Sequence, residues 1–190
     1  MTFDTKIFEW IHGLAGKNAL ADNLGIFFAN YIPYILFIGF FFILFRTHRG
    51  RGRIFFFAQT VLILIVSRGI VTELIQFFWH RARPFMTLGF TPLLTPMSGA
   101  SFPSGHASFY IALAFAIYFM DRGWGILYII LASLNALARV YVGVHYPADI
   151  LAVAGIGILS AFLIRGLIRR YVPPEKAVKP LETKEVPPVV

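Results

Sequence analysis

The sequence has no cysteine and little charge. Without a thiol, the chain can form neither a disulfide framework nor a thiolate metal site. Charged side chains make up 14% of the 190 residues, whereas about 25% is usual in soluble globular domains. A chain of this length can form one domain with a real core, but this composition excludes an ordinary water-soluble one.

Apolar residues are abundant instead, at 58% of the chain, and phenylalanine alone occurs 21 times. A helix needs about 20 mostly apolar residues to cross a bilayer. Five stretches meet or approach this length: residues 24–45, 54–79, 104–120, 124–141 and 148–168. The sequence therefore predicts an all-α fold, an integral membrane helical bundle with about five transmembrane helices.

The two ends of the chain differ from this apolar part. Residues 2–15 place apolar side chains at helical spacing between charged ones, which favours an amphipathic helix in the membrane interface and brings the total to six helices. Residues 171–190 are rich in proline, lysine and glutamate, which predicts a disordered cytoplasmic tail. Residues 1–170 are expected to form a single membrane-embedded domain.

Basic residues are distributed unequally over the loops. Of the 17 Lys and Arg residues, 11 would lie on one side of the membrane and five on the other, with Arg68 inside the second span. The larger group comprises Arg46, Arg49, Arg51, Arg53, Arg122, Arg165, Arg169, Arg170, Lys176, Lys179 and Lys184, and the smaller one Lys6, Lys17, Arg81, Arg83 and Arg139. The positive-inside rule makes the larger group cytoplasmic. Membrane topology thus accounts for the positive charge, and we expect membrane lipids rather than nucleic acid as partners.

One motif, Pro103-Ser104-Gly105-His106, stands at the start of the third apolar stretch, on the predicted outer face. Proline is favoured in the first turn of a helix, where free backbone N–H groups can bind an anion, and Gly105 lets a phosphate approach the backbone. Alone, the first three residues are better explained as a turn before a helix. His106, and a second histidine motif on the same face, favour phosphate chemistry.

The second motif is Arg139-x5-His145-x3-Asp149. Pro147 opens the last span, and Asp149 in its first turn can bond one imidazole nitrogen of His145, which leaves the other nitrogen as a nucleophile. A base with an orienting acid is the arrangement of a catalytic triad. The alternative is that Asp149 is a plain helix-start acid and His145 an interfacial side chain.

Arg83 and Arg139 each lie near the end of an apolar stretch. Their guanidinium groups can bind the oxygens over which negative charge spreads during phosphoryl transfer. A metal site built from His106, His145 and Asp149 is the alternative, but two converging cations would repel a divalent ion. We therefore expect no metal and no cofactor.

Polar residues also interrupt the second span. Glu73, Gln76 and His80 are three and four residues apart, so they would share one helical face that leads to the outer site. Arg68 is interpreted as part of a structural network, because charges inside a bilayer normally face other protein groups. Arg81 is interpreted as an interfacial anchor.

Together with Arg83-Pro84, the two motifs resemble the signature of the type 2 phosphatidic acid phosphatase superfamily, whose pattern reads KxxxxxxRP, PSGH and SRxxxxxHxxxD. The similarity covers roughly residues 60–165. It implies a metal-independent lipid phosphatase in which His145 attacks phosphorus to form a phosphohistidine. By the same resemblance, Asp149 orients His145, His106 protonates the leaving oxygen, and the phosphoryl oxygens are held by Arg83, Arg139, Ser104 and Gly105.

Two positions depart from this pattern. Gln76 stands where the pattern has a lysine, and Ala138 replaces the serine before Arg139. Losing a cation weakens charge neutralisation around the phosphoryl group, although Gln76 can still donate a hydrogen bond. We expect His80 or Arg81 to cover part of the lost charge, with Glu73 as a further accessory residue.

The short chain, its N-terminal segment and the run from His80 to Phe85 look most like bacterial undecaprenyl-diphosphatases of this superfamily. The predicted substrate is therefore undecaprenyl diphosphate, hydrolysed to undecaprenyl phosphate at the outer face of the bacterial cytoplasmic membrane. Phosphatidylglycerophosphate, phosphatidate and lipid A phosphatases share the same core, and the first two are the alternatives. A transporter or lipid-binding protein that only holds anionic headgroups, and an inactive family member, are two others.

Overall fold

The computed structural model describes residues 2–47, 50–95 and 99–171, and within these ranges it contains helices and no strands. Three elements are π- or 3₁₀-helical and carry the letter η. In chain order the elements are α1 (Phe3–His12), α2 (Ala19–Ile26), η1 (Phe27–Tyr31), α3 (Ile32–Thr47), α4 (Gly50–Leu64), η2 (Ile65–Thr72), α5 (Glu73–Phe78), α6 (Pro84–Leu88), α7 (Gly105–Tyr118), α8 (Arg122–Tyr141), α9 (Pro147–Ile168) and η3 (Arg169–Tyr171).

Several of these elements join end to end, so the described residues form seven helical bodies where the sequence predicted six. The additional one is the short helix α6. Four bodies are long and apolar enough to cross a membrane: Ala19–Arg46, Gly50–Phe78, Arg122–Tyr141 and Pro147–Tyr171. The predicted all-α membrane bundle is thereby confirmed, with α7 as a shorter fifth apolar helix.

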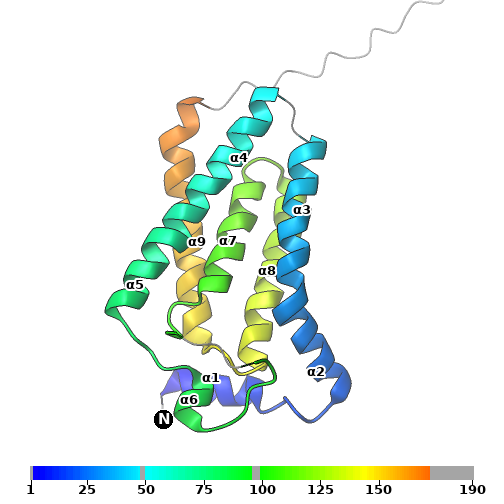
Figure 1. Ribbon diagram of the computed structural model, residues 1–190, viewed down its shortest axis with the longest axis vertical. Coiled ribbons are helices and arrows are strands. Elements are labelled where there is room, and N and C mark those ends of the chain that lie inside the picture. Colours follow the sequence, from blue (N-terminus) through cyan, green and yellow to red (C-terminus); the bar gives the residue numbers. More distant parts are fainter. Residues whose placement is uncertain (1, 48–49, 96–98, 172–190) are drawn as a thin grey trace, which may run out of the picture.

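Helix α7 is the centre of the bundle. It packs against α8, α9, α4 and η2, and Figure 1 shows it enclosed by longer helices. At 14 residues it is about 21 Å long, less than the hydrocarbon thickness of a bilayer. Because its neighbours cover its sides, α7 need not span the membrane by itself. Its N-terminus therefore lies inside the bundle, farther from the end that carries α1 and α6 than the ends of α8 and α9 do (Figure 1).

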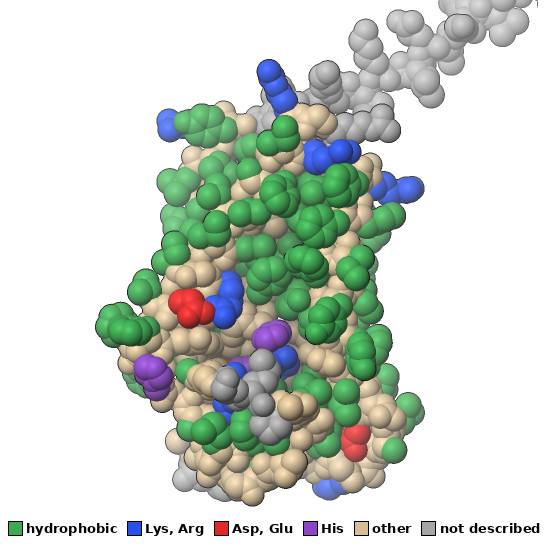
Figure 2. Space-filling view, viewed as in Figure 1, with side chains coloured by type: hydrophobic (Ala, Val, Ile, Leu, Met, Phe, Trp, Pro, Cys, Tyr) green, Lys and Arg blue, Asp and Glu red, His purple; other side chains and the backbone are tan. Residues whose placement is uncertain are grey.

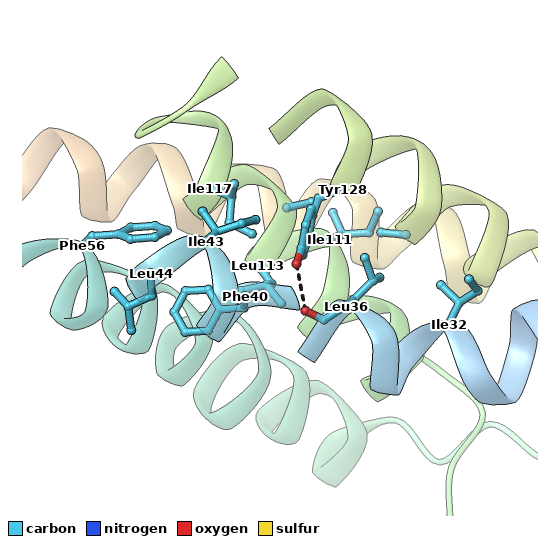
Figure 3. Packing of buried hydrophobic residues seen from close by; sticks show 12 residues of the cluster. Ile32, Leu36, Phe40, Ile43, Leu44, Phe56, Ile111, Leu113, Ile117 and Tyr128 are labelled. Atoms are coloured by element: carbon cyan, nitrogen blue, oxygen red, sulfur yellow. Dashed lines mark hydrogen bonds between the residues drawn. The ribbon is translucent and has the colours of Figure 1, made fainter. Parts of the chain in front are cut away.

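The largest apolar cluster joins α3, α4, α7 and α8 (Figure 3). Phe40 and Phe56 pack ring to ring beside Ile117, and the Tyr128 hydroxyl donates to the Leu36 carbonyl at 3.0 Å. A Cβ at position 39 would lie 2.5 Å from this hydroxyl, so Gly39 leaves the space that the tyrosine fills. Small residues at helix contacts are typical of membrane bundles, where close packing replaces the hydrophobic effect.

Helix α1 lies across the ends of α8 and α9. Its Phe8 is buried against Val140 and Tyr146, while Phe3 and Trp10 stay exposed. This arrangement agrees with the amphipathic character of residues 2–15, because one face of the helix is packed and the other carries large apolar side chains outward.

The two ends of the bundle differ in charge (Figure 2). Helices α3, α4, α8 and α9 bring the arginines of the larger basic group to the end opposite α1, and an apolar surface separates the two ends (Figures 1 and 2). Arg49, the three lysines of that group and the predicted tail beyond Tyr171 lie outside the described residues.

Candidate active site

His145 lies in the short connection between α8 and α9, at the end of the bundle that carries α1 and α6 (Figure 1). Gly143 has φ of 88°, a left-handed conformation that side chains other than glycine rarely adopt, and it turns the chain out of α8. Pro147 then starts α9. The connection is thus held at both ends, and His145 is 2% exposed.

The two nitrogens of the His145 ring have different partners. Nδ1 lies 3.0 Å from the Ser101 carbonyl, which can only accept, so Nδ1 carries the proton. Nε2 lies 3.1 Å from Ser104 Oγ and 3.3 Å from Arg83 Nη1, both of which can donate to it. In this tautomer the lone pair of Nε2 points toward an arginine and a serine, two side chains that can also donate hydrogen bonds to phosphoryl oxygens.

Burial is the main reason why the pKa of His145 is lowered to about 4; the charges of Arg139 and Arg83 lower it further, and Asp149 opposes the shift. The imidazole is therefore neutral at neutral pH. A neutral ring with one nitrogen free of protons is the form that can act as a nucleophile.

Asp149 is fully buried at the start of α9. Its Oδ2 accepts from Ser101 Oγ at 2.5 Å and from the Tyr146 backbone at 2.8 Å, and Oδ1 accepts from Arg81 at 2.9 Å. The distance from Oδ2 to His145 Nδ1 is 3.5 Å, longer than the hydrogen bond of that nitrogen to the Ser101 carbonyl. Asp149 and Ser101 therefore orient the histidine together.

Arg83 precedes the proline that begins α6, and its side chain is buried. The guanidinium donates to the backbone carbonyls of Gly99 and Val144 as well as approaching His145. Burial lowers the pKa of Arg83, and the charge of Asp149 opposes this. The arginine thus ties the segment before α7 to the segment before α9 and presents its charge to Nε2.

Ser104 is the N-cap of α7, which it caps through its hydroxyl, and the same hydroxyl contacts His145. Gly105 and His106 follow in the first turn, as the sequence predicted. His106 is exposed and lines a cavity of about 360 Å³ together with Arg139 and Tyr110. His106 and Arg139 thus border one hollow.

Arg139 lies in the last turn of α8 and is 3% exposed. It contacts the Ala29 carbonyl at 3.5 Å, and Asn135, one turn earlier, donates to the same carbonyl and to that of Phe28. Both carbonyls belong to η1, a π-helical segment of a kind that often occurs at functional sites.

Gln76 does not face the cavities beside His106. Its side-chain amide donates to the Pro103 carbonyl at 2.8 Å and so holds the residue before Ser104. The prediction that Glu73, Gln76 and His80 share one helical face is wrong for His80. Helix α5 ends at Phe78, and Trp79 is already extended, so His80 lies beyond the helix.

Arg81 is not the interfacial anchor that the sequence suggested. It binds Asp149 and also Asp4 of α1, at 2.5 Å, and stacks on the Tyr146 ring at 4.0 Å. Burial would lower the pKa of Arg81, but the hydrogen bond to Asp4 and the charge of Asp149 raise it. Its charge is engaged by two carboxylates, which contradicts the idea that it replaces the missing lysine.

Two residues of the site escaped the sequence reasoning. Ser101 bonds both Asp149 and His145, and Asp4 bonds both Arg81 and the Ala148 backbone N–H. Asp4 is 145 positions away from Asp149 in the chain, and no local pattern relates them. Ser101 stands two residues before Pro103, and its proximity to that motif was the one available signal.

The arrangement brings together a neutral, oriented imidazole, a second histidine and two arginines. In the described part of the chain, His106, His145 and Asp149 do not form a group that could hold a metal ion. Such a site can bind a phosphoryl group between cations and attack it with Nε2.

Comparison with known proteins agrees with this chemistry. The model of the PAP2 superfamily matches residues 56–172. The chain is 29% identical over 160 residues to the undecaprenyl-diphosphatase BcrC of Bacillus subtilis, covering 83% of this chain and 80% of the relative. It is 32% identical over 141 residues to phosphatidylglycerophosphatase B of the same organism, covering 64% and 66%.

The fold is similar to the crystal structure of Aquifex aeolicus LpxE, with a TM-score of 0.73 and 23% identity, over 87% of this chain and 96% of that one. The family match covers more than half of the sequence and includes His106, His145 and Asp149. This chain therefore belongs to the PAP2 superfamily and is a membrane lipid phosphatase.

Proposed function

We propose that the protein hydrolyses a lipid phosphate through a phosphohistidine formed on His145 Nε2. The observation that carries this proposal is that the two ring nitrogens of His145 have different partners. Nδ1 is bonded to the Ser101 carbonyl, and Nε2 faces Ser104 and Arg83. Nε2 attacks phosphorus, the bond from phosphorus to the leaving oxygen breaks, and the electron pair of that bond moves to the oxygen. His106 donates a proton to it.

In the second half of the reaction, water attacks the phosphohistidine. The N–P bond breaks, its electron pair returns to Nε2, and His106 takes a proton from the water. Arg83, Arg139, the Ser104 hydroxyl and the backbone at Gly105 bind the phosphoryl oxygens, with no metal or cofactor. A fixed donor of this kind contributes about 100-fold or more to the rate. Gln76 acts indirectly, by holding the Pro103 carbonyl.

We propose undecaprenyl diphosphate as the substrate, with undecaprenyl phosphate and inorganic phosphate as products. A relative that aligns with 83% of this chain carries the corresponding name. A phosphatidylglycerophosphatase is also similar, over a smaller part of the chain. Phosphatidylglycerophosphate is therefore the second candidate, followed by phosphatidate. A protein that only binds or transports anionic lipids is less well supported, because binding alone does not need an oriented nucleophile.

We propose that residues 1–170 form one domain in the bacterial cytoplasmic membrane, with the site on the outer face. The support is the charge asymmetry: arginines gather at the end opposite the site, and that end is cytoplasmic by the positive-inside rule. A lipid diphosphate released outside the membrane would then meet the site directly.

The test is phosphate release by the purified protein in detergent, from undecaprenyl diphosphate, phosphatidylglycerophosphate and phosphatidate, with EDTA present. We expect the highest kcat/KM for undecaprenyl diphosphate and a loss of at least about 1,000-fold in His145→Ala, since the nucleophile is removed. Arg46→Gln, at the other end of the bundle, is the matched control and should be as active as the unchanged protein. Release from none of the three lipids would refute the function, and loss of activity in EDTA would refute its independence of metal.

A further inference from the structure

Arg68 has no role in the mechanism above, yet its side chain reaches the site. It extends from η2 to the first residue of α7: a Cβ at position 105 would lie 2.8 Å from Arg68 Nε and 3.1 Å from Nη2. Arg68 and His106 also line a second cavity of about 330 Å³, with Phe37 and Tyr110 in its wall. A guanidinium group is thus placed beside the histidine that protonates the leaving oxygen.

The π-helical geometry of η2 explains this placement. In a π-helix, contacts join residues five apart. Thr72 Oγ1 donates to the Ser67 carbonyl at 2.9 Å, and Arg68 pairs with Glu73. In each pair the two residues are five positions apart. Ser67 and Thr72 also bond Ser108 of α7 in a buried network. The network fixes η2 against the first turns of α7, and Arg68 is thereby directed at Gly105.

Glu73 holds the arginine without enclosing it. The ion pair uses Nη1, whereas Nε and Nη2 are the atoms nearest Gly105. Both side chains are partly exposed, and Arg68 lines the cavity while Glu73 does not. Figure 2 shows a basic and an acidic side chain side by side near a histidine in the hollow of this face. A tethered guanidinium of this kind is preorganised for an anion.

We propose that Arg68 binds the phosphate that leaves with the lipid, and so makes the enzyme selective for lipid diphosphates over lipid monophosphates. This inference rests on the proposed function. His145 attacks the terminal phosphorus, and the second phosphate, next to the lipid, becomes the leaving group beside His106. This phosphate gains negative charge as the bridging P–O bond breaks, until His106 donates its proton to the bridging oxygen.

The charge of Arg68 meets that developing charge, whereas a lipid monophosphate leaves as an alcohol with no phosphate for Arg68 to bind. The same residue also supplies a cation in a protein that has Gln76 where the pattern has a lysine. Gln76 holds the Pro103 carbonyl, and neither Gln76 nor Arg81 lines the two cavities beside His106, whereas Arg68 lines one of them. Arg68 is therefore the residue that the geometry places for this task.

The experiment compares farnesyl diphosphate with farnesyl phosphate, which share one tail and differ by the second phosphate. We expect Arg68→Gln to lower kcat/KM for the diphosphate by about 100-fold, which is the effect of one lost charged donor. The ratio of kcat/KM for the diphosphate to kcat/KM for the monophosphate should fall at least about tenfold. Arg68→Lys should give an intermediate ratio, because it keeps the charge and loses the planar fork. Inhibition by inorganic pyrophosphate should weaken in Arg68→Gln, and inhibition by inorganic phosphate should not.

Arg46→Gln, which also removes one arginine from a transmembrane body, is the control and should leave the ratio unchanged. Equal losses for both substrates in Arg68→Gln and Arg68→Lys, with inhibition by pyrophosphate and phosphate affected alike, would show that Arg68 is only structural and would overturn the inference. A protein that hydrolyses neither farnesyl compound nor the three lipids above would refute the proposed function itself. The two failures are therefore distinguishable.

Discussion

The His145 ring makes opposite kinds of contact on its two sides. A carbonyl fixes the proton on Nδ1, while a serine and an arginine surround Nε2. Because the ring is buried near Arg83 and Arg139, adding a second proton would place a third positive charge among groups already removed from water. The surroundings that direct the lone pair of Nε2 toward Ser104 and Arg83 also keep that lone pair unprotonated.

A pH dependence follows from this. An ordinary histidine becomes protonated as the pH falls through about 6.5, but the pKa of His145 is lowered to about 4. The neutral form therefore persists between these values, and the acid limb of kcat/KM that belongs to the nucleophile should lie near pH 4. The measurement is kcat/KM for the diphosphate from about pH 3 to pH 8.

Phosphate groups of the substrate also titrate, near pH 6. Their ionisation should be measured by phosphorus NMR in the same micelles, and the pH profile of kcat/KM should be corrected for it. An acid limb that remains between pH 6 and 7 after this correction would show that His145 has an ordinary pKa, contrary to its buried position.

At the scale of elements, α1 is connected to the active site by charge. Asp4 accepts from the Ala148 backbone at the start of α9 and pairs with Arg81, which in turn pairs with Asp149. Arg81 thus lies between two carboxylates, one in α1 and one beside the proposed nucleophile His145. If this chain of charges matters for the reaction, α1 takes part in positioning Asp149.

We expect Asp4→Asn to lower kcat about tenfold with little change in KM. Without the charge of Asp4, Arg81 interacts with Asp149 alone, so the Asp149 carboxylate interacts less strongly with His145. A charged hydrogen bond of this kind contributes about 1.5–3 kcal/mol, and less where water reaches it. Steady-state kinetics in detergent measure the effect. Glu9→Gln, an exposed residue of the same helix, is the control. If both variants behaved alike at equal thermal stability, α1 would have no part in positioning Asp149.

The elements also show where sequence reasoning succeeds and where it fails. His145, Asp149, Ser104 and His106 could be predicted to come together because prolines mark the starts of two helices on one side of the membrane. The placement of the Arg68 side chain against Gly105 could not, since a helical period of 3.6 residues does not anticipate the π-helical segment η2 or its contacts five residues apart. The partners of Arg81 were missed for another reason: they come from the two ends of the domain.

At the scale of the whole molecule, the short helix α7 lets a polar site form inside an apolar bundle. Longer helices surround α7, so its capped N-terminus, with Ser104 and His106, lies farther from the site end of the molecule than the ends of α8 and α9 do (Figure 1). The proposed phosphate chemistry would then take place close to the level of lipid headgroups while the lipid tail stays in the membrane.

The orientation of this bundle gives a last prediction. The chain has no cysteine, so single cysteines can be introduced without background labelling of other thiols. Lys17→Cys lies in the connection after α1 at the site end, and Gly123→Cys lies in the first turn of α8 at the opposite end; both positions are exposed. Since the arginines gather near Gly123, that end should face the cytoplasm. Lys17→Cys also removes one positive charge from the outer side, which strengthens the same orientation.

In intact cells, a maleimide that cannot cross membranes should label Lys17→Cys and leave Gly123→Cys unlabelled until the membrane is permeabilised. The unchanged protein, which has no thiol, is the blank. The opposite labelling pattern would place His145 on the cytoplasmic side, and a substrate exposed outside the cell could then no longer reach it without being moved across the membrane first.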